Sequence, residues 1–476
     1  MTNLTMISTV DLPTTISSEE LEKFISGLGG TVVTPESPDY DSARTIWNAM
    51  VDKHPSMIVR CTSTADVIHS VKFAREHNLL VAVKGAGHNI AGNAICNGGL
   101  VIDLSQMKSI RVDTATQRAY AEPGLTLGEF DQETQKYGLA TPVGINSTTG
   151  ISGLTLGGGF GWLTRKYGAT VDNLIGADVV TAEGKLVHAS AQENPELFWG
   201  IRGGGGNFGV VTSFEYQLHP VGPEVFAGLI VLPFDQARSA LQNYRQYATT
   251  LPEEANTWVV LRKAPPLPFL PESVHGQEVL VFPNIYFGDA TEGEKIISAV
   301  RKFGTPVGEA LGVMPYTSWQ QAFDPLLTPG ARNYWKSHNF TELSDDLIDV
   351  VIDSISKLPS PHCEIFIGMM GAAYSRIPAS ATAYSHRDAN FVINVHSRWE
   401  TPEEDKACIE WAREFFRNAA PFATGGVYVN FMTEEEGDRV DGGAYKHDVL
   451  SRLTKLKNTW DPTNFFRMNQ NIKPTS

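Results

Sequence analysis

The stretch Gly144-Ile-Asn-Ser-Thr-Thr-Gly-Ile-Ser-Gly-Leu-Thr-Leu-Gly-Gly-Gly-Phe-Gly161 holds more glycine than the interior of a helix or strand accepts, because each glycine loses extra backbone entropy when it is ordered. A shorter glycine loop, Lys84-Gly-Ala-Gly-His-Asn89, precedes it in the chain. Glycines of this kind let backbone N–H groups converge on a phosphate or a flat ring. Together the two stretches predict loops that closely approach a bound dinucleotide.

The chain has 476 residues, of which 42% are hydrophobic, and a net charge of −15. This length exceeds what a single hydrophobic core usually supports, so two domains are expected. Nucleic-acid binding needs clustered Lys and Arg, and this acidic sequence shows no such cluster. We therefore expect a dispersed globular protein that does not bind nucleic acid.

The four cysteines, Cys61, Cys96, Cys363 and Cys408, are far apart and lack C-x-x-C spacing. Neither a zinc site nor a disulfide framework is indicated, and we expect reduced thiols and no bound metal. The N-terminus lacks a basic segment followed by an apolar one, and no apolar run reaches the roughly 18 residues of a membrane span. We therefore expect a cytoplasmic protein without a membrane segment, and no obligate protein partner is evident.

Hydrophobic periodicity predicts short strands and amphipathic helices along the chain. The composition changes after Pro220 and Pro223, beyond which glycine clusters are rarer. We expect an N-terminal domain at 1–223, with a small helix before a core that starts near residue 53, a second domain at 224–422 and a C-terminal segment at 423–476. The expected helices are 19–28, 64–77, 126–137, 345–357, 403–418 and one from 450 that stops near 461, and the expected strands are 57–61, 79–84, 99–104, 110–113, 118–122, 174–182, 210–218, 279–287, 363–370 and 390–399.

Two common nucleotide-binding motifs do not fit. A nicotinamide-binding Rossmann site needs G-x-G-x-x-G between a strand and a helix. Gly85 and Gly87 supply the first two glycines, but Ile90 stands at the third position. No G-x-x-x-x-G-K-S/T motif occurs, which excludes a P-loop.

The expected strand at 390–399 carries polar side chains in the middle of one face. Strand alternation places Asn394, His396 and Arg398 on the same face as Val392. Imidazole titrates near neutral pH and can take up a proton, and a core histidine bonded to a neighbouring carbonyl is an equal interpretation. Packing alone therefore does not explain the polar side chains on this face.

A set of motifs in order along most of the chain resembles the FAD-linked oxidases of the vanillyl-alcohol oxidase and p-cresol methylhydroxylase superfamily, and within it the berberine-bridge-enzyme-like branch. The resemblance implies an α+β fold. It comprises a two-subdomain FAD-binding module of the p-cresol methylhydroxylase type, an α/β substrate domain with an antiparallel sheet over the flavin, and a C-terminal segment that returns to the FAD domain. The motifs are the loop 84–92, Asp103-Leu104-Ser105, the glycines of 153–161 with 165–168 and 172–173, the run 197–209 and the tail 461–471.

The resemblance gives His88 a role, because in the family a histidine after this glycine loop is bonded through a ring nitrogen to the 8-methyl group of the flavin. A neutral imidazole nitrogen is nucleophilic, and neighbouring glycines allow close approach. A histidine that only hydrogen-bonds in a tight loop is the alternative. Many relatives add a cysteine bond in a Gly-x-Cys segment, but the matching segment here is Gly144-Ile145-Asn146. The resemblance therefore implies covalent FAD with a single attachment, through His88.

Further FAD contacts are implied in the first glycine loop, the second glycine stretch, the strand that starts at Val210 and the C-terminal tail. Thr149 matches a position that governs oxygen access to the flavin, although a threonine that caps a turn is an equal interpretation. The implied cofactor-binding residues besides His88 are Lys84, Gly85, Ala86, Gly87, Asn89, Asn146, Thr148, Thr149, Gly150, Gly153, Phe160, Gly161, Val210, Val211, Asn469 and Asn471.

Phe160 departs from the family pattern. Plant relatives that oxidise alcohols often have tyrosine there, and its hydroxyl belongs to the base that deprotonates the substrate. A base in this chain must come from elsewhere, within hydrogen-bond reach of the substrate proton. The candidate catalytic residues are Asn394, His396 and Tyr428, and the candidate substrate contacts are Phe160, Tyr384, Asn394 and Asn430. Tyr428 and Asn430 match a strand that faces the flavin in the family.

The resemblance implies an FAD-dependent oxidase of a small molecule. Hydride leaves a C–H next to an alcohol, sugar hydroxyl or amine, and molecular oxygen accepts the electrons and becomes hydrogen peroxide, while the cofactor supplies the reactive chemistry. The alternatives are a flavin dehydrogenase, a ring-forming or tailoring enzyme of natural-product biosynthesis, and a binding protein with a vestigial flavin.

Overall fold

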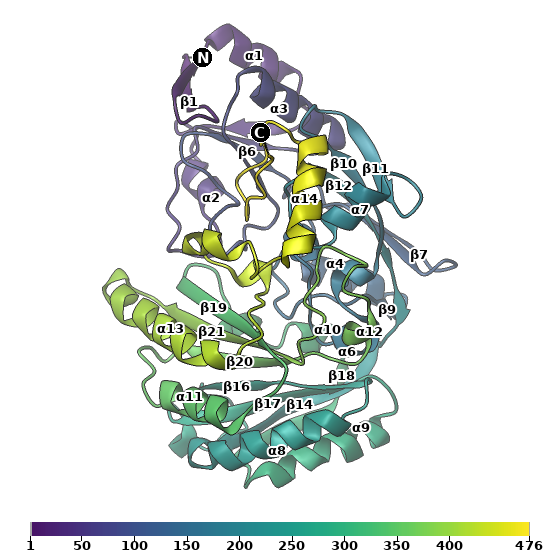
Figure 1. The fold of residues 1–476 in the computed structure, drawn as a ribbon, viewed down its shortest axis with the longest axis vertical. Helices are drawn as coiled ribbons and strands as arrows, with labels where there is room; N and C mark the ends of the chain where they lie inside the picture. Colours follow the sequence, from purple (N-terminus) through teal and green to yellow (C-terminus); the bar gives the residue numbers. More distant parts are fainter. Residues whose placement is uncertain (1, 476) are drawn as a thin grey trace.

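A computed structural model describes residues 2–475, so the outermost residue at each end of the predicted domains lies outside the described part. Within that part the chain forms three main sheets flanked by helices (Figure 1). Two of the sheets come from the N-terminal part of the chain, and the third and largest comes from the middle. The cavity described below lies between these two groups.

The first sheet has the strand order β3-β4-β6-β5. Strands β4, β6 and β5 are parallel to one another, and β3 runs antiparallel to β4. Strand β5 ends at Lys84 and delivers the first glycine loop. The elements of this part are β1 (Leu4–Ile7), β2 (Pro13–Ile16), α1 (Ser18–Ser26), β3 (Thr31–Val33), α2 (Tyr40–Arg44), β4 (Met57–Arg60), α3 (Thr64–Glu76), β5 (Val81–Lys84) and β6 (Leu100–Asp103).

The second sheet is antiparallel, with the order β11-β10-β12-β8-β7. Residues 151–156 form α5, so the expectation that the glycine-rich stretch contains no helix is wrong. Gly153 is the one glycine inside this short helix, which ends at Gly157, and its cost of roughly 1 kcal/mol is tolerable. The elements are β7 (Ile110–Asp113), β8 (Arg118–Ala121), α4 (Leu127–Gln135), β9 (Leu139–Ala140), α5 (Ile151–Leu156), α6 (Thr164–Tyr167), β10 (Leu174–Val180), β11 (Leu186–Ser190), α7 (Pro195–Ile201), β12 (Val210–Gln217) and β13 (His219–Pro220).

The large sheet is antiparallel throughout, with the order β18-β14-β17-β16-β20-β21-β19, and β15 also pairs with β17. Helices α8, α9, α11 and α13 lie on the side away from the two N-terminal sheets (Figure 1). The elements are β14 (Glu224–Pro233), α8 (Ala237–Thr250), β15 (Ala255–Thr257), β16 (Val259–Lys263), β17 (Glu278–Tyr286), α9 (Ala290–Ile297), β18 (Gly308–Pro315), α10 (Tyr316–Gln320), β19 (Arg332–Phe340), α11 (Asp345–Ile355), β20 (Glu364–Met369), α12 (Ala373–Arg376), β21 (Phe391–Trp399) and α13 (Asp405–Ala419).

Amphipathic helices cover one face of this sheet because their apolar residues recur at helical spacing. In α13, Trp411 and Phe415 are four residues apart and both are buried. They join the largest apolar core, which contains residues of α8 and α11 and of the sheet strands. The opposite face of the sheet is left to form one wall of the cavity.

The C-terminal segment returns to the N-terminal part of the molecule, as the resemblance implied. Helix α14 (His447–Trp460) packs against α7 and lies beside β10 and β12 in Figure 1. Beyond it, the backbone N–H of Ile472 donates to Asn207 Oδ1 at 3.0 Å. Strand β14 of the large sheet begins at Glu224, and the domain boundaries themselves remain predictions.

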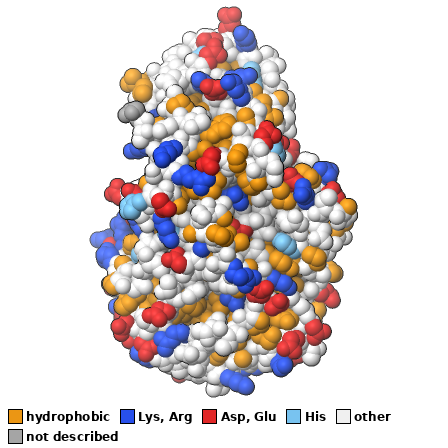
Figure 2. All heavy atoms as spheres, turned by 45° about the vertical axis from the view of Figure 1, so that its right-hand side comes forward, with side chains coloured by type: hydrophobic (Ala, Val, Ile, Leu, Met, Phe, Trp, Pro, Cys, Tyr) orange, Lys and Arg blue, Asp and Glu red, His pale blue; other side chains and the backbone are white. Residues whose placement is uncertain are grey.

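No helix in residues 2–475 is both long and apolar enough to cross a membrane. The same residues contain no group of three or more His, Cys, Asp or Glu side chains placed to hold a metal ion. On the face shown in Figure 2, acidic and basic side chains are interspersed, and the described residues form no continuous basic stripe there. Such a mixed face lacks the positive patch that a phosphate backbone requires.

Candidate active site

A cavity of about 390 Å³ lies where the glycine loops face the large sheet. Its volume is within the range of ligand sites, roughly 300–1,000 Å³. We call its two sides the glycine wall and the sheet wall. Residues of the loops after β5 and β9, of α5 and of the C-terminal tail form the glycine wall, and residues of β16, β17, β19, β20 and β21 form the sheet wall.

The glycine wall offers unpaired backbone donors. The N–H groups of residues 86–91 donate no hydrogen bond to any group in residues 2–475. Gly87 in this loop has a φ of 76°, which disfavours any residue with a Cβ, and an added Cβ would lie 3.3 Å from Ile46. In the C-terminal tail the buried Oδ1 atoms of Asn469 and Asn471 also lack a partner among the described residues. The free backbone donors suit an anion such as a pyrophosphate, and the free amide oxygens suit a donor group of the same ligand, so these residues fit FAD.

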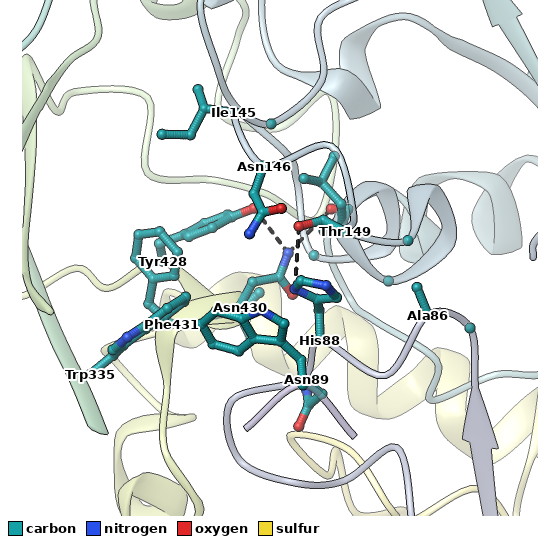
Figure 3. A pocket seen from close by; sticks show the side chains of 18 of the residues that line it. Ala86, His88, Asn89, Ile145, Asn146, Thr149, Trp335, Tyr428, Asn430 and Phe431 are labelled. Carbon is teal, nitrogen blue, oxygen red and sulfur yellow. Dashed lines mark hydrogen bonds between the residues drawn. The ribbon is translucent and has the colours of Figure 1, made fainter. Parts of the chain in front are cut away.

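His88 projects into the cavity from the first glycine loop (Figure 3). Its ring stacks on Trp47 with 5.1 Å between centroids, and Thr148 Oγ1 lies 3.0 Å from Nε2. Asn146 Oδ1 accepts from the Thr148 backbone N–H and also from its hydroxyl. The Thr148 hydroxyl hydrogen is thus committed to Asn146, so Nε2 is the ring nitrogen that carries hydrogen.

The second ring nitrogen of His88 keeps its lone pair. Nδ1 lies 3.4 Å from Thr149 Oγ1, a long contact for a hydrogen bond. Burial lowers the pKa of His88 to about 4, which keeps the imidazole neutral at physiological pH. A neutral ring with a free Nδ1 is chemically able to act as a nucleophile.

On the sheet wall, cross-strand register aligns side chains into two rows. Arg262 on β16 pairs with Glu364 on β20, which pairs with His396 on β21, and His396 pairs with Trp335 on β19. We call these four residues the charged row. Two residues along each strand, a second row contains Val260, Phe366 and Asn394. All seven side chains line the cavity, because residues two apart on a strand share a face.

The charged row is internally paired. Arg262 Nη1 donates to Glu364 Oε2 at 2.7 Å, and Glu364 Oε1 lies 3.3 Å from His396 Nδ1. Burial opposes ionisation of Glu364, but Arg262, His396 and Arg398 together outweigh it and hold the pKa of Glu364 below its usual range. Burial also lowers the pKa of His396, whose Nε2 lies 3.2 Å from Asn333 Oδ1. Both ring nitrogens of His396 thus have acceptor partners, and Glu364 favours the charged ring, but burial outweighs this effect.

The Asn394 amide forms no hydrogen bond within residues 2–475. The side chain is 3% exposed, and its Oδ1 is buried without a partner. Buried amides are almost always paired in folded proteins. The free amide at the cavity wall therefore indicates a group that a bound molecule satisfies.

Residues 427–431 are not a strand, and the expectation that they match one is wrong: Val429–Phe431 form a 3₁₀ turn. The turn is held by side chains instead of a strand ladder. The Tyr428 hydroxyl accepts from the Gly159 backbone N–H at 3.1 Å and from Asn430 Nδ2 at 2.9 Å. Burial raises the pKa of Tyr428, so it is a neutral phenol. Phe160 packs edge-on against it.

The structure brings most of the expected site residues together. Tyr384 is not among them, because it packs behind Gly158 and its hydroxyl accepts from Tyr374. The Lys84 amine is also engaged elsewhere, with the Ala43 carbonyl and Asp103. Thr148, Gly161 and Asn471 also lie off the cavity lining. The expected residues that line the cavity are Gly85, Ala86, Gly87, His88, Asn89, Asn146, Thr149, Gly150, Gly153, Phe160, Val210, Val211, Asn394, His396, Tyr428, Asn430 and Asn469.

Sequence reasoning missed Arg262, Glu364, Trp335 and Trp47, which also line the cavity. A signal existed for two of them. Arg262 follows the apolar run Val259-Val-Leu261, and Glu364 precedes Ile365-Phe-Ile367, so each is a charge attached to a buried strand. Such charges need a partner, but the partner is defined by strand pairing between distant segments.

The chain matches known families and proteins along its length. The family described as FAD binding domain matches residues 55–190, and the family described as Berberine and berberine like matches residues 427–473. An FAD-linked oxidoreductase of Dictyostelium discoideum is 32% identical over 463 residues, which cover 96% of this chain and 98% of that protein.

Two further comparisons are with an enzyme whose name states its substrate and with a solved structure. The (R)-6-hydroxynicotine oxidase of Paenarthrobacter nicotinovorans is 31% identical and covers 94% of this chain and 97% of its own. The crystal structure of 6-hydroxy-D-nicotine oxidase from Arthrobacter nicotinovorans has a TM-score of 0.84 at 30% identity, with 94% of this chain and 98% of that chain covered. The expected fold class is confirmed. This chain belongs to the berberine-bridge-enzyme-like branch of FAD-linked oxidoreductases, within the vanillyl-alcohol oxidase and p-cresol methylhydroxylase superfamily.

Proposed function

We propose that this protein is an oxidase with FAD joined through a single bond to His88. It removes hydride from a C–H next to a hydroxyl or amine of a small molecule and releases hydrogen peroxide. The observation that carries the proposal is the state of His88: a neutral imidazole with a free Nδ1 beside a loop of unpaired backbone N–H groups. The attachment is proposed at Nδ1. Asn146 stands where relatives have a second, cysteine attachment, so one bond is proposed.

When bound, FAD supplies a two-electron acceptor. The substrate gives up two electrons as a hydride and also one proton, and oxygen takes up two electrons and two protons to become hydrogen peroxide. The residues proposed to hold the cofactor are the loop 85–89, Asn146, Thr149, Val210, Val211 and Asn469, all of which line the cavity.

For an alcohol substrate, a protein group must take the proton. Asn394 is a neutral amide and Tyr428 is a neutral phenol with a raised pKa, so neither accepts a proton at neutral pH. We assign this role to His396: a substrate hydroxyl takes the place of Asn333 Oδ1, which lies 3.2 Å from Nε2, and gives its proton to that nitrogen. Glu364 Oε1, 3.3 Å from Nδ1, favours the charged ring. An amine that binds as the free base needs no such group, since its nitrogen lone pair drives hydride loss.

The test is to denature the purified protein, separate it on a gel and look for flavin fluorescence in the protein band, with mass spectrometry of the His88 peptide. We expect a fluorescent band and the added mass of FAD on His88. His88→Ala should lose band fluorescence, whereas His447→Ala, at an exposed position, should keep it. Flavin that dissociates on denaturation would contradict the covalent bond, and protein that purifies without flavin would contradict the whole proposal.

Turnover is measured on the same protein. Oxygen consumption and peroxide release under air, in equal amounts, are expected with a substrate that bleaches the flavin absorbance. Bleaching by substrate without reoxidation by air would instead identify a dehydrogenase that uses another electron acceptor.

A further inference from the structure

The sheet wall carries free polar groups of one kind. The Asn394 amide has no partner, the indole Nε1 of Trp335 is buried without a partner, and Arg262 Nη2 donates no hydrogen bond within residues 2–475. All three side chains line the cavity. Nδ2 of Asn394, Nε1 of Trp335 and Nη2 of Arg262 are donors, whereas Asn394 Oδ1 is the one acceptor among them. The free groups of this wall therefore suit a molecule that presents an acceptor edge.

The rest of the sheet wall is apolar and largely aromatic. Phe366 is next to Asn394 in its row and Val260 follows, and Trp258, which precedes β16, lines the cavity beside them, as do Phe160 and Phe431 from outside the sheet. Trp258 packs edge-on against Phe366 with 4.8 Å between ring centroids, and Trp335 does so against Phe431 at 5.3 Å. Rings arranged in this way offer faces and edges to a further flat ring.

The paired charges limit what else binds here. Arg262 and Glu364 neutralise one another, and His396 is neutral with both nitrogens engaged. A sugar presents a hydroxyl on nearly every carbon, and each hydroxyl buried without a partner weakens binding. Trp258 Nε1 is a further buried group without a partner on this side of the cavity. The free groups are then donors apart from Asn394 Oδ1, so few free acceptors are left for the hydroxyl hydrogens of a sugar, and the wall disfavours a carbohydrate.

We propose that the sheet wall binds a flat aromatic molecule whose edge carries a carbonyl or hydroxyl oxygen, and that Asn394 is the residue that selects this edge. The proposal rests on the proposed function, since it names the substrate class of the same cavity. The ring lies among Phe366, Trp335 and the neighbouring aromatic side chains, and the oxygen accepts from the Asn394 amide.

Binding is measured by calorimetry on the purified, flavin-loaded protein, with acetophenone, cyclohexyl methyl ketone and glucose as probes. Acetophenone and its saturated analogue share the carbonyl and differ in the flat ring. We expect acetophenone to bind about fivefold more tightly than the saturated ketone, and glucose to give no binding heat. Glucose that binds as tightly as acetophenone, or equal affinity for the two ketones, would overturn the proposal.

The role of Asn394 is tested by substitution. Asn394→Leu keeps the approximate volume and removes the amide, and we expect acetophenone binding to weaken about tenfold. Asn394→Asp has nearly the same shape and replaces the amide donor with an acceptor, so it should weaken acetophenone binding at least as much. This second variant tests the assignment if the leucine variant does not fold. Asn390→Leu makes the same change at the residue before β21, where the amide donates to the Thr341 carbonyl outside the cavity, and should leave binding unchanged. Unchanged binding in both Asn394 variants would refute the assignment.

The two proposals fail in different ways. Protein that purifies without flavin contradicts the proposed function. A flavin that is present and bleached by glucose but not by 4-hydroxybenzyl alcohol leaves the proposed function standing and contradicts the aromatic substrate class. Bleaching by 4-hydroxybenzyl alcohol, together with tight acetophenone binding, supports both.

Discussion

The two walls of the cavity are built in different ways. The glycine wall presents backbone, with free N–H groups at 86–91 and a left-handed glycine at Gly87. The sheet wall presents side chains, with an ion pair, a histidine and an amide aligned by strand register. A backbone wall tolerates little change in shape, whereas a side-chain wall tolerates changes in chemistry that alter what it binds. Loss of the backbone wall should therefore remove cofactor binding, whereas changes to the side-chain wall should alter what else is bound.

The largest expected effect is at the glycine wall. Gly87→Asp places a Cβ at a φ of 76° and against Ile46, and adds a negative charge where the proposed pyrophosphate lies. We expect flavin content, measured from the absorbance ratio of the purified protein, to fall by roughly tenfold or more, since strain and charge repulsion act together.

Gly138→Asp is the matched control for Gly87→Asp. Gly138 also has a positive φ, of 66°, but no atom lies within 4 Å of an added Cβ. This variant therefore introduces backbone strain at a position that does not line the cavity. It should purify with full flavin content. Equal flavin loss in both variants would show that backbone strain, and not contact with the cofactor, explains the effect.

Breaking the ion pair on the sheet wall should lower the stability of the protein. Glu364→Leu leaves Arg262 buried without its partner, and breaking a buried ion pair in this way costs about 3–5 kcal/mol. The free energy of unfolding from urea denaturation measures the loss. Arg262→Met combined with Glu364→Leu removes both charges and should recover most of it. Asp353→Leu, which breaks an exposed pair with Lys357, should cost under about 0.5 kcal/mol. A double variant no more stable than Glu364→Leu would argue against charge pairing as the cause.

The two walls also differ in how far sequence alone predicted them. The glycine wall is local, because the residues after β5 lie beside each other in the chain, and His88 could be singled out from its loop. On the sheet wall, strand alternation placed Asn394 and His396 on one face. It could not supply Arg262, Glu364 and Trp335, because their alignment depends on register between strands that are tens of residues apart.

The turn at 427–431 was misassigned for a related reason. Its conformation is determined by contacts of Tyr428 and Asn430 with Gly159 and Leu154, some 270 residues away in the chain. Side-chain bonds to a distant backbone replace the strand ladder that the local pattern suggested. Tyr384 also matched an expectation by sequence position but faces Tyr374 and lies off the cavity. Local patterns thus predicted backbone loops better than side-chain neighbours.

The lowered pKa of His88 predicts how flavin attachment depends on pH. Attachment needs the neutral ring, and a pKa of about 4 keeps it neutral well below the 6.5 of an ordinary histidine. Protein prepared without flavin and mixed with FAD should therefore become fluorescent on a denaturing gel at the same rate at pH 8 and pH 5.5, and half as fast only near pH 4. A midpoint near pH 6.5 would mean that the ring is not desolvated as the structure indicates.

The smallest expected effect tests which ring nitrogen of His88, on the glycine wall, is free to bond to the flavin. Thr148 accepts from Nε2 because its own hydrogen is committed to Asn146, and this arrangement leaves Nδ1 as the nucleophile. Thr148→Val removes the acceptor and lets the ring hydrogen occupy either nitrogen, so flavin attachment should slow by about three- to tenfold, the worth of one hydrogen bond. Thr148→Ser keeps the hydroxyl and should attach flavin at the original rate. If the valine variant is as fast as the serine variant, the orientation of His88 is fixed by its stacking on Trp47 and not by this hydrogen bond, and the glycine wall would then depend on side-chain packing as much as the sheet wall does.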